Sequence, residues 1–167
     1  MSNIKQTYIS YDEYKGHVSE LCRQVYLSHW RPDYVVGITR GGLLPATMIS
    51  HYFGIPCHTL HVSLRDSTSG PESNLWMAED AFNGKNILVV DDMNDSGATL
   101  NWIQQDWQSG CLPDDPKWQQ TWGHNVRVAV IVNDAHSAFT DIDYSSLDIN
   151  KLEDPQWIVF PYEEWWK

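Results

Sequence analysis

Basic residues are scarce in this sequence. Lys and Arg together number 11, against 22 Asp and Glu, which gives a formal net charge of −11 at pH 7. A nucleic-acid-binding surface needs a basic patch or stripe that neutralises phosphates, and the few basic residues here form no such cluster. The composition therefore argues against nucleic acid as a partner.

Long apolar runs and an N-terminal signal peptide are also missing, so we expect no membrane association and a cytoplasmic protein. The three cysteines are an odd number without C-x-x-C spacing, which fits the same compartment. Cys22 falls near the apolar stripe of a predicted helix and Cys57 in a predicted strand, so both are expected to be small buried side chains without chemistry. The histidines are scattered and indicate no zinc site.

The chain has the length of a single domain, 1–167, with a sizeable core and one active site. A capping box at Ser10 and Glu13 begins an amphipathic helix that extends to about His29. The expected elements that follow are strand 34–38, helix 43–53, strand 57–63, strand 86–91, helix 98–109 and strand 126–132. Strands that alternate with helices predict an α/β fold with a three-layer, mostly parallel sheet flanked by helices.

Two connections are longer than the elements require. Residues 64–85 are polar and are expected to form a long loop. Residues 110–125 contain two prolines and two tryptophans, which favours a loop packed by its own aromatic side chains, with a subunit contact as the alternative.

The most informative run is 86–99, where an apolar strand leads into two acids and then a turn of small residues. The apolar part predicts a central parallel strand, and ligands bind at the carboxyl ends of such strands. Asp91 and Asp92 follow the apolar part directly. The next small residues can close their backbone N–H groups around a phosphate where a helix begins; they are Ser96, Gly97, Ala98 and Thr99.

A second strand, turn and helix unit lies at 33–46. Its turn contains Arg40, Gly41 and Gly42, and Pro45 falls in the first turn of the expected helix, where proline is tolerated. The planar guanidinium of Arg40 suits a diphosphate, and the glycines let the backbone approach closely.

These segments resemble the type I phosphoribosyltransferases. The run 91–99 is similar to their signature for phosphoribosyl pyrophosphate (PRPP), in which two acids and two or so variable residues precede Asp-Thr/Ser-Gly-x-Thr. The run 40–45 is similar to the pyrophosphate loop Arg-Gly-Gly-Leu-x-Pro of purine-salvage members. Residues 157–163, Trp-Ile-Val-Phe-Pro-Tyr-Glu, resemble the ending Trp-x-x-Phe-Pro-Trp-Glu of bacterial and archaeal xanthine, guanine and hypoxanthine phosphoribosyltransferases.

The resemblance implies the fold of that family, with a core at about 8–135 and a small base-binding C-terminal hood at about 136–167. A mobile lid is implied at about 64–82. The implied reaction is Mg²⁺-dependent transfer of the 5-phosphoribosyl group from PRPP to hypoxanthine, guanine or xanthine, with release of pyrophosphate, in purine salvage. The family's habits and the surplus of tryptophans also imply a homo-oligomer, a dimer or a tetramer.

The same resemblance assigns roles at matching positions. Asp91 and Asp92 would face the ribose hydroxyls and Mg²⁺, partly through PRPP and water. Asp95 would take a proton from N7 of the purine as general base, and Arg40 is the second candidate catalytic residue because it binds pyrophosphate. The implied PRPP-binding residues are Thr39, Arg40, Gly41, Asp91, Asp92, Asp95, Ser96, Gly97, Ala98 and Thr99.

Base recognition is implied for Trp157, which would stack on the purine, and for its neighbour Ile158. Related purine enzymes carry a lysine at the end of the strand that corresponds to 127–132, and this chain has Asn133 and Asp134 there. The Asn133 amide can still donate to the exocyclic oxygen of a 6-oxopurine, whereas Asp134 can accept from an amino group and shift the preference. A lysine or arginine from a loop is the third alternative.

A polyanionic substrate and an acidic chain require local compensation in the cleft. Mg²⁺, Arg40 and backbone amides would supply it, with Arg65 and Lys85 as further candidates. Two alternative functions stay open, a non-catalytic regulator that binds PRPP or a nucleotide, and a phosphoribosyltransferase with a non-standard base. The presence of Asp95 favours an enzyme.

Overall fold

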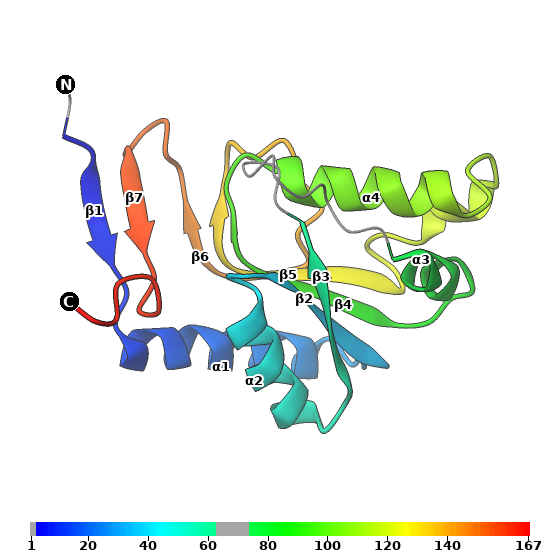
Figure 1. Cartoon of the computed structure of the whole chain (residues 1–167), viewed down its shortest axis with the longest axis horizontal. Helices are drawn as coiled ribbons and strands as arrows, with labels where there is room; N and C mark the ends of the chain where they lie inside the picture. The colour runs from blue at the N-terminus through cyan, green and yellow to red at the C-terminus, as the bar shows by residue number, and fades with distance from the viewer. Residues whose placement is uncertain (1–2, 63–73) are drawn as a thin grey trace.

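The computed structural model describes residues 3–62 and 74–167. Its elements are β1 (Lys5–Tyr8), α1 (Tyr11–Leu27), β2 (Tyr34–Thr39), α2 (Leu43–Phe53), β3 (Cys57–His61), α3 (Leu75–Phe82), β4 (Ile87–Asn94), α4 (Ala98–Gly110), the 3₁₀ helix η1 (Pro116–Gln120), β5 (Val126–Asp134), β6 (Tyr144–Ile149) and β7 (Gln156–Val159). Figure 1 shows them arranged in layers around a twisted sheet.

The main sheet has five strands in the order β3-β2-β4-β5-β6, and every neighbouring pair is parallel. Alternate residues of its central strands point to opposite faces, so Leu88 and Val90 pack with α1 and α2, whereas Val89 packs with α3 and α4. Figure 1 shows α1 and α2 on one side of the sheet and α4 on the other. The predicted three-layer α/β fold is confirmed.

Helix α1 begins where the sequence predicted. Ser10 Oγ accepts from Glu13 N at 3.1 Å, and Glu13 Oε1 accepts from Ser10 N at 3.2 Å, which completes the capping box. The helix buries one stripe of side chains against the sheet, including Cys22, which is buried as expected. A capping box with an apolar stripe is thus sufficient local information to fix this helix.

Two strands that the sequence analysis did not identify form a separate sheet. β1 and β7 pair in parallel, with Lys5 opposite Gln156 and Tyr8 opposite Val159, and lie beside the end of the main sheet in Figure 1. β6 falls within the range predicted for the hood, 136–167, yet it pairs with β5 in the main sheet. Short strands far apart in the sequence carry too little local pattern to reveal such pairing.

The expected loop 64–85 is corrected in its second half. Residues Leu75–Phe82 form α3, which buries Met77, Ala78 and Ala81 in the core beside α4. The polar residues at 64–74 dominate the composition of the whole segment and concealed a helix in which six of the eight residues are apolar. The first part of the predicted lid, 64–73, lies outside the described residues.

The 110–125 connection is packed by aromatic side chains. Trp118 is buried and its Nε1 donates to Cys111 O at 2.8 Å, while Trp122 lies against Trp107 with ring centroids 5.4 Å apart. Packing, one of the two alternatives raised for this loop, therefore accounts for both tryptophans. No helix in the described part of the chain is long and apolar enough to span a membrane.

Candidate active site

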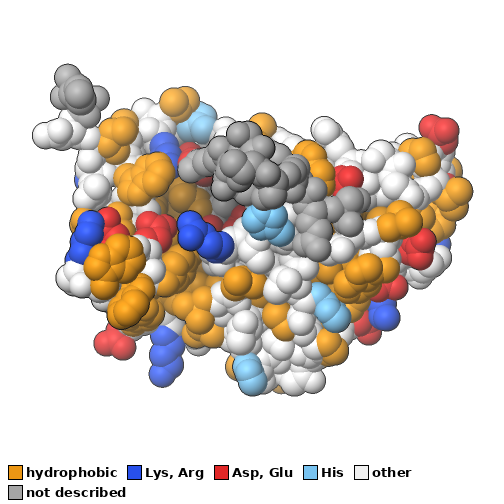
Figure 2. Space-filling model, in the orientation of Figure 1, with side chains coloured by type: hydrophobic (Ala, Val, Ile, Leu, Met, Phe, Trp, Pro, Cys, Tyr) orange, Lys and Arg blue, Asp and Glu red, His pale blue; other side chains and the backbone are white. Residues whose placement is uncertain are grey.

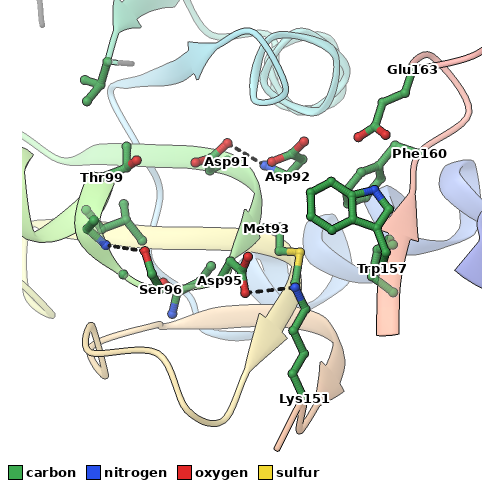
Figure 3. Close-up of a pocket in the computed structure, with 16 residues that line it drawn as sticks. Asp91, Asp92, Met93, Asp95, Ser96, Thr99, Lys151, Trp157, Phe160 and Glu163 are labelled. Carbon is green, nitrogen blue, oxygen red and sulfur yellow. Dashed lines mark hydrogen bonds and ion pairs between the residues drawn. The ribbon is translucent and has the colours of Figure 1, made fainter. Parts of the chain in front are cut away.

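A cavity of about 490 Å³ opens at the carboxyl end of β4. One wall consists of residues 91–100, which run from β4 through the loop into α4. The opposite wall comes from the C-terminal segment and includes Trp157, Ile158, Phe160 and Glu163 (Figure 3). Strand β4 extends to Asn94, beyond the predicted end at 91, so the acidic pair lies within the strand. The position still agrees with the rule that parallel sheets place ligands at their carboxyl edge.

The loop 95–99 forms the end of the cavity where α4 begins. Gly97 has φ of +86°, and a side chain at this position would collide with Phe139 N and Ser137 Oγ. Only glycine combines this backbone conformation with so close an approach. Ser96 Oγ accepts from Ala98 N at 3.2 Å. The start of α4, where N–H groups and the positive end of the helix dipole gather, therefore faces the cavity and suits an anion.

Asp91 and Asp92 line the same cavity. Asp92 N donates to Asp91 Oδ1 at 2.8 Å, and Tyr162 Oη donates to Asp92 Oδ2 at 2.8 Å. Burial and the neighbouring Asp92 carboxylate raise the pKa of Asp91. Burial and the charge of Asp92 also raise the pKa of Tyr162, so its hydroxyl stays neutral and donates. Tyr162 was not assigned a role from the sequence, although it stands in the C-terminal motif.

The acidic pair fits the kind of site that Mg²⁺ uses in phosphate chemistry. This ion keeps several waters and binds one or two carboxylates together with the substrate's phosphates, so two cavity-facing carboxylates suffice. Across the described ranges, no group of three or more His, Cys, Asp or Glu side chains is arranged to hold a metal ion by itself.

The loop 39–42 reaches the acidic pair from the neighbouring strand β2. A side chain on Gly41 would collide with the Asp92 carboxylate, and Tyr162 Oη also lies 3.4 Å from Gly41 O. Thr39 Oγ1 is hydrogen-bonded to His61 Nδ1 at 2.8 Å, and the Thr39–Arg40 peptide bond is cis. Thr39, Arg40 and Gly41, the predicted residues of this loop, are not among the residues that line the cavity. Their loop contacts Asp92, which does line it.

Asp95 belongs to the wall formed by residues 91–100 and faces a lysine that the sequence analysis did not single out. Lys151 Nζ is 3.0 Å from Asp95 Oδ1 and 5.6 Å from the centre of the Trp157 ring. Figure 3 shows the three side chains converging on the cavity from different elements. The only sequence hint was the open alternative of a basic residue from a loop.

The two residues at the end of β5 are not among those that line the cavity. Asn133 is not among the residues that line the cavity, and its Oδ1 accepts from Asn94 Nδ2 at 3.0 Å. Asp134 is buried, and its Oδ1 accepts from His136 N at 3.2 Å and from Lys151 N at 3.3 Å. The strand end therefore shapes the backbone around the cavity.

The structure describes only one of the two additional candidates for charge compensation, Lys85. The Nζ of Lys85 lies 5.8 Å from the centre of the Tyr34 ring, and Lys85 does not line the cavity. Arg65 lies outside the described residues. Glu163, which the sequence analysis did not assign, contributes a further carboxyl group whose pKa is raised by burial and by Asp92.

Comparisons with known proteins bear on the family and the fold of this chain. Residues 10–164 match the family described as the phosphoribosyl transferase domain. The chain is 26% identical over 125 residues to xanthine phosphoribosyltransferase 1 of Saccharomyces cerevisiae, a match that covers 61% of this chain and 60% of that protein. It is 24% identical over 185 residues to the hypoxanthine-guanine phosphoribosyltransferase of Schizosaccharomyces pombe, covering 93% of this chain and 88% of that protein. This chain thus spans less than two thirds of the first of these relatives.

The fold is shared with a solved structure over nearly the whole of both chains. A purine phosphoribosyltransferase from Pyrococcus horikoshii superimposes with a TM-score of 0.70 at 22% identity, covering 96% of this chain and 95% of that one.

Proposed function

Since this chain belongs to the type I phosphoribosyltransferases, we propose that it transfers the 5-phosphoribosyl group of PRPP to a 6-oxopurine. The acceptor would be hypoxanthine, guanine or xanthine, and the second product would be pyrophosphate. In a cell this reaction serves purine salvage.

One observation carries the proposal. A single cavity has the glycine turn at the start of α4 at one end, an indole ring at the other, and a carboxylate, that of Asp95, between them. A sugar phosphate joined to a flat base has the same order of groups. Loop 95–99 suits the 5-phosphate, and Trp157 offers an aromatic face on which a purine can stack.

The chemical step exchanges two bonds at the anomeric carbon of ribose. The bond from C1 to the pyrophosphate oxygen breaks, a bond from C1 to a ring nitrogen of the base forms, and the proton on N7 passes to the Asp95 carboxylate. The sugar is cation-like in the transition state, so anionic and polar groups beside it stabilise it. Asp91 and Asp92 lie in the wall where the ribose hydroxyls would be held.

The loop 39–42 would bind the pyrophosphate group as it leaves. Arg40 presents a fork of donors, and Gly41 lets the backbone approach Asp92 closely. Asp91 and Asp92 would hold Mg²⁺ together with the phosphates of PRPP and water, and the ion would neutralise charge on the leaving group.

A homo-oligomer is also proposed, a dimer or a tetramer. Figure 2 shows apolar side chains gathered over the two-stranded sheet and the C-terminal segment. Exposed large apolar residues there include Ile4, Tyr8, Trp165 and Trp166. Apolar areas of this kind are often buried in assemblies. Size-exclusion chromatography with light scattering measures the mass of the protein in solution. A monomer at micromolar concentration would contradict this proposal.

The activity is tested by incubating the protein with PRPP, Mg²⁺ and hypoxanthine, guanine, xanthine or adenine in turn, and by measuring nucleotide and pyrophosphate. Transfer to at least one 6-oxopurine is expected. PRPP binding without product from any base would instead support the regulatory alternative.

The role of Asp95 is tested with Asp95→Asn, which keeps the shape and removes the base. The rate of transfer should fall by about 10²–10⁴-fold while PRPP binding is retained. The control is Asp114→Asn, which changes an exposed aspartate outside the cavity and should leave the rate unchanged. Equal activity of the Asp95 variant and the wild type would remove Asp95 as the general base.

A further inference from the structure

We propose that Lys151 is the residue that selects 6-oxopurines over 6-aminopurines, by donating a hydrogen bond to the exocyclic oxygen of the base. The inference rests on the proposed function and names the group that recognises its acceptor. Related purine enzymes carry the lysine that recognises the exocyclic oxygen at the end of the strand that corresponds to β5, whereas Lys151 lies in the segment after β6.

The position of Lys151 supports this role. Its Nζ lies 3.0 Å from Asp95 Oδ1, and its side chain is only 21% exposed. The ammonium is 5.6 Å from the centre of the Trp157 ring. Lys151 is the only lysine or arginine among the described residues that line the cavity. A base stacked on Trp157 with N7 toward Asp95 would therefore present its neighbouring edge to this ammonium.

The chemistry of that edge distinguishes the two classes of base. A 6-oxopurine has an acceptor, O6, next to N7, whereas a 6-aminopurine has an N–H₂ donor at the same place. Asp95 and Lys151 form a matching pair of acceptor and donor, because a carboxylate accepts from N7–H and an ammonium donates to O6. An amino group would point its hydrogens at the ammonium and leave both donors without an acceptor. Mismatches of this kind cost more than a lost contact.

The ammonium can serve the base without leaving Asp95. A lysine carries three donors and no acceptor, so one N–H can remain with the carboxylate while another reaches O6. The adjacent charges also lie in a partly buried site, where hydrogen bonds from a charged donor are stronger than those between neutral groups.

Buried hydrogen bonds fix the backbone that carries Lys151. Asp134 Oδ1 accepts from Lys151 N at 3.3 Å and from His136 N at 3.2 Å, and Ala135 N donates to Ile149 O at 2.8 Å. The aspartate at the end of β5 therefore holds the segment that supplies the lysine. Asn133, the other candidate donor, is not among the residues that line the cavity.

The test is Lys151→Met, which keeps an unbranched side chain of similar length and removes the donor. We expect kcat/KM for hypoxanthine and guanine to fall about 10- to 100-fold, the range of one lost base contact. The KM for PRPP should change less than twofold. The preference for hypoxanthine over adenine, measured as the ratio of the two kcat/KM values, should fall at least tenfold. A matched control is Lys5→Met, which breaks an exposed ion pair to Asp154 of similar length, 3.2 Å, outside the cavity.

Equilibrium binding of the nucleotide products gives a second readout. Inosine monophosphate should bind the Lys151→Met variant at least tenfold more weakly than the wild type, whereas adenosine monophosphate should bind equally or more tightly. Lys151→Arg keeps the cation and should keep the preference. Lys151→Leu also removes the donor and replaces the methionine variant if that variant does not fold. An unchanged preference in Lys151→Met, or equal losses for both nucleotides, would overturn the inference. Absence of transfer by the wild-type protein with every base would instead contradict the proposed function.

Discussion

The hydrogen bond between Tyr162 and Asp92 joins the C-terminal segment to the acidic pair, and Tyr162→Phe removes the hydroxyl that donates it. The phenyl ring is retained, so its stacking on Phe160, with ring centroids 5.7 Å apart, and its edge contact with Tyr14 should persist. Only the hydroxyl is lost, with its hydrogen bond to Asp92 Oδ2 at 2.8 Å and its longer one to Gly41 O at 3.4 Å. The variant therefore tests one hydroxyl group beside the cavity.

The expected magnitude follows from the charge and burial of the partners. A hydrogen bond to a charged group contributes about 1.5–3 kcal/mol. For a domain of this size that corresponds to a fall in Tm of roughly 3–12 °C. The Asp92 carboxylate would also lose the group that orients it, and a loss near 1.4 kcal/mol in the substrate complex is about tenfold in affinity. We therefore expect a lower Tm and a KM for PRPP about tenfold higher.

Calorimetry and initial-rate kinetics measure both effects. Tyr8→Phe is the matched control, because Tyr8 Oη also donates at 2.8 Å, to Gln6 Oε1, but does so on the exposed surface of the two-stranded sheet. That variant should match the wild type in Tm and KM. If Tyr162→Phe were equally indistinguishable from the wild type, the reasoning that this contact orients Asp92 would be refuted.

Three further predictions follow from burial and close packing. Gly41→Ala places a carbon against the Asp92 carboxylate, at a packing cost of about 1–3 kcal/mol, so the KM for PRPP should rise roughly tenfold. Its control is Gly16→Ala, at an open position on the surface of α1, which should raise the free energy of unfolding by about 0.5–1 kcal/mol. Burial raises the pKa of Cys22 to about 11, so iodoacetamide in mild alkali should label it last of the three thiols in the native protein, as peptide mass mapping would reveal. Burial raises the pKa of Asp143 above 3.8, so the folded state binds a proton at this carboxyl more tightly than the unfolded state does. The folded protein therefore loses stability as the pH rises from the unfolded-state pKa through the folded-state pKa of Asp143. Over that pH range, the free energy of unfolding of Asp143→Asn, measured in urea, should increase relative to that of the wild type.

Local sequence carried most of the information about the fold and about the glycine-containing loops 39–42 and 95–99. The capping box at Ser10 fixed the start of α1, and the apolar runs placed the central strands, because neighbouring residues determine helix caps and strand burial. Loop 95–99 was equally readable, since the glycine at its turn and the small residues around it adopt their conformation from their own chemistry. Helix α3 was missed because its apolar stripe is short and depends on the core for support.

By itself, then, the sequence determined the layered α/β architecture, the two glycine-containing turns and the carboxylates at the end of β4. Tertiary structure alone decided which distant groups complete the cavity. Tyr162 reaches Asp92 across 70 positions of the chain, and Lys151 reaches Asp95 from the segment after β6. Such contacts arise when separate strands pair and bury their side chains, and no local pattern of residues encodes the distance between them.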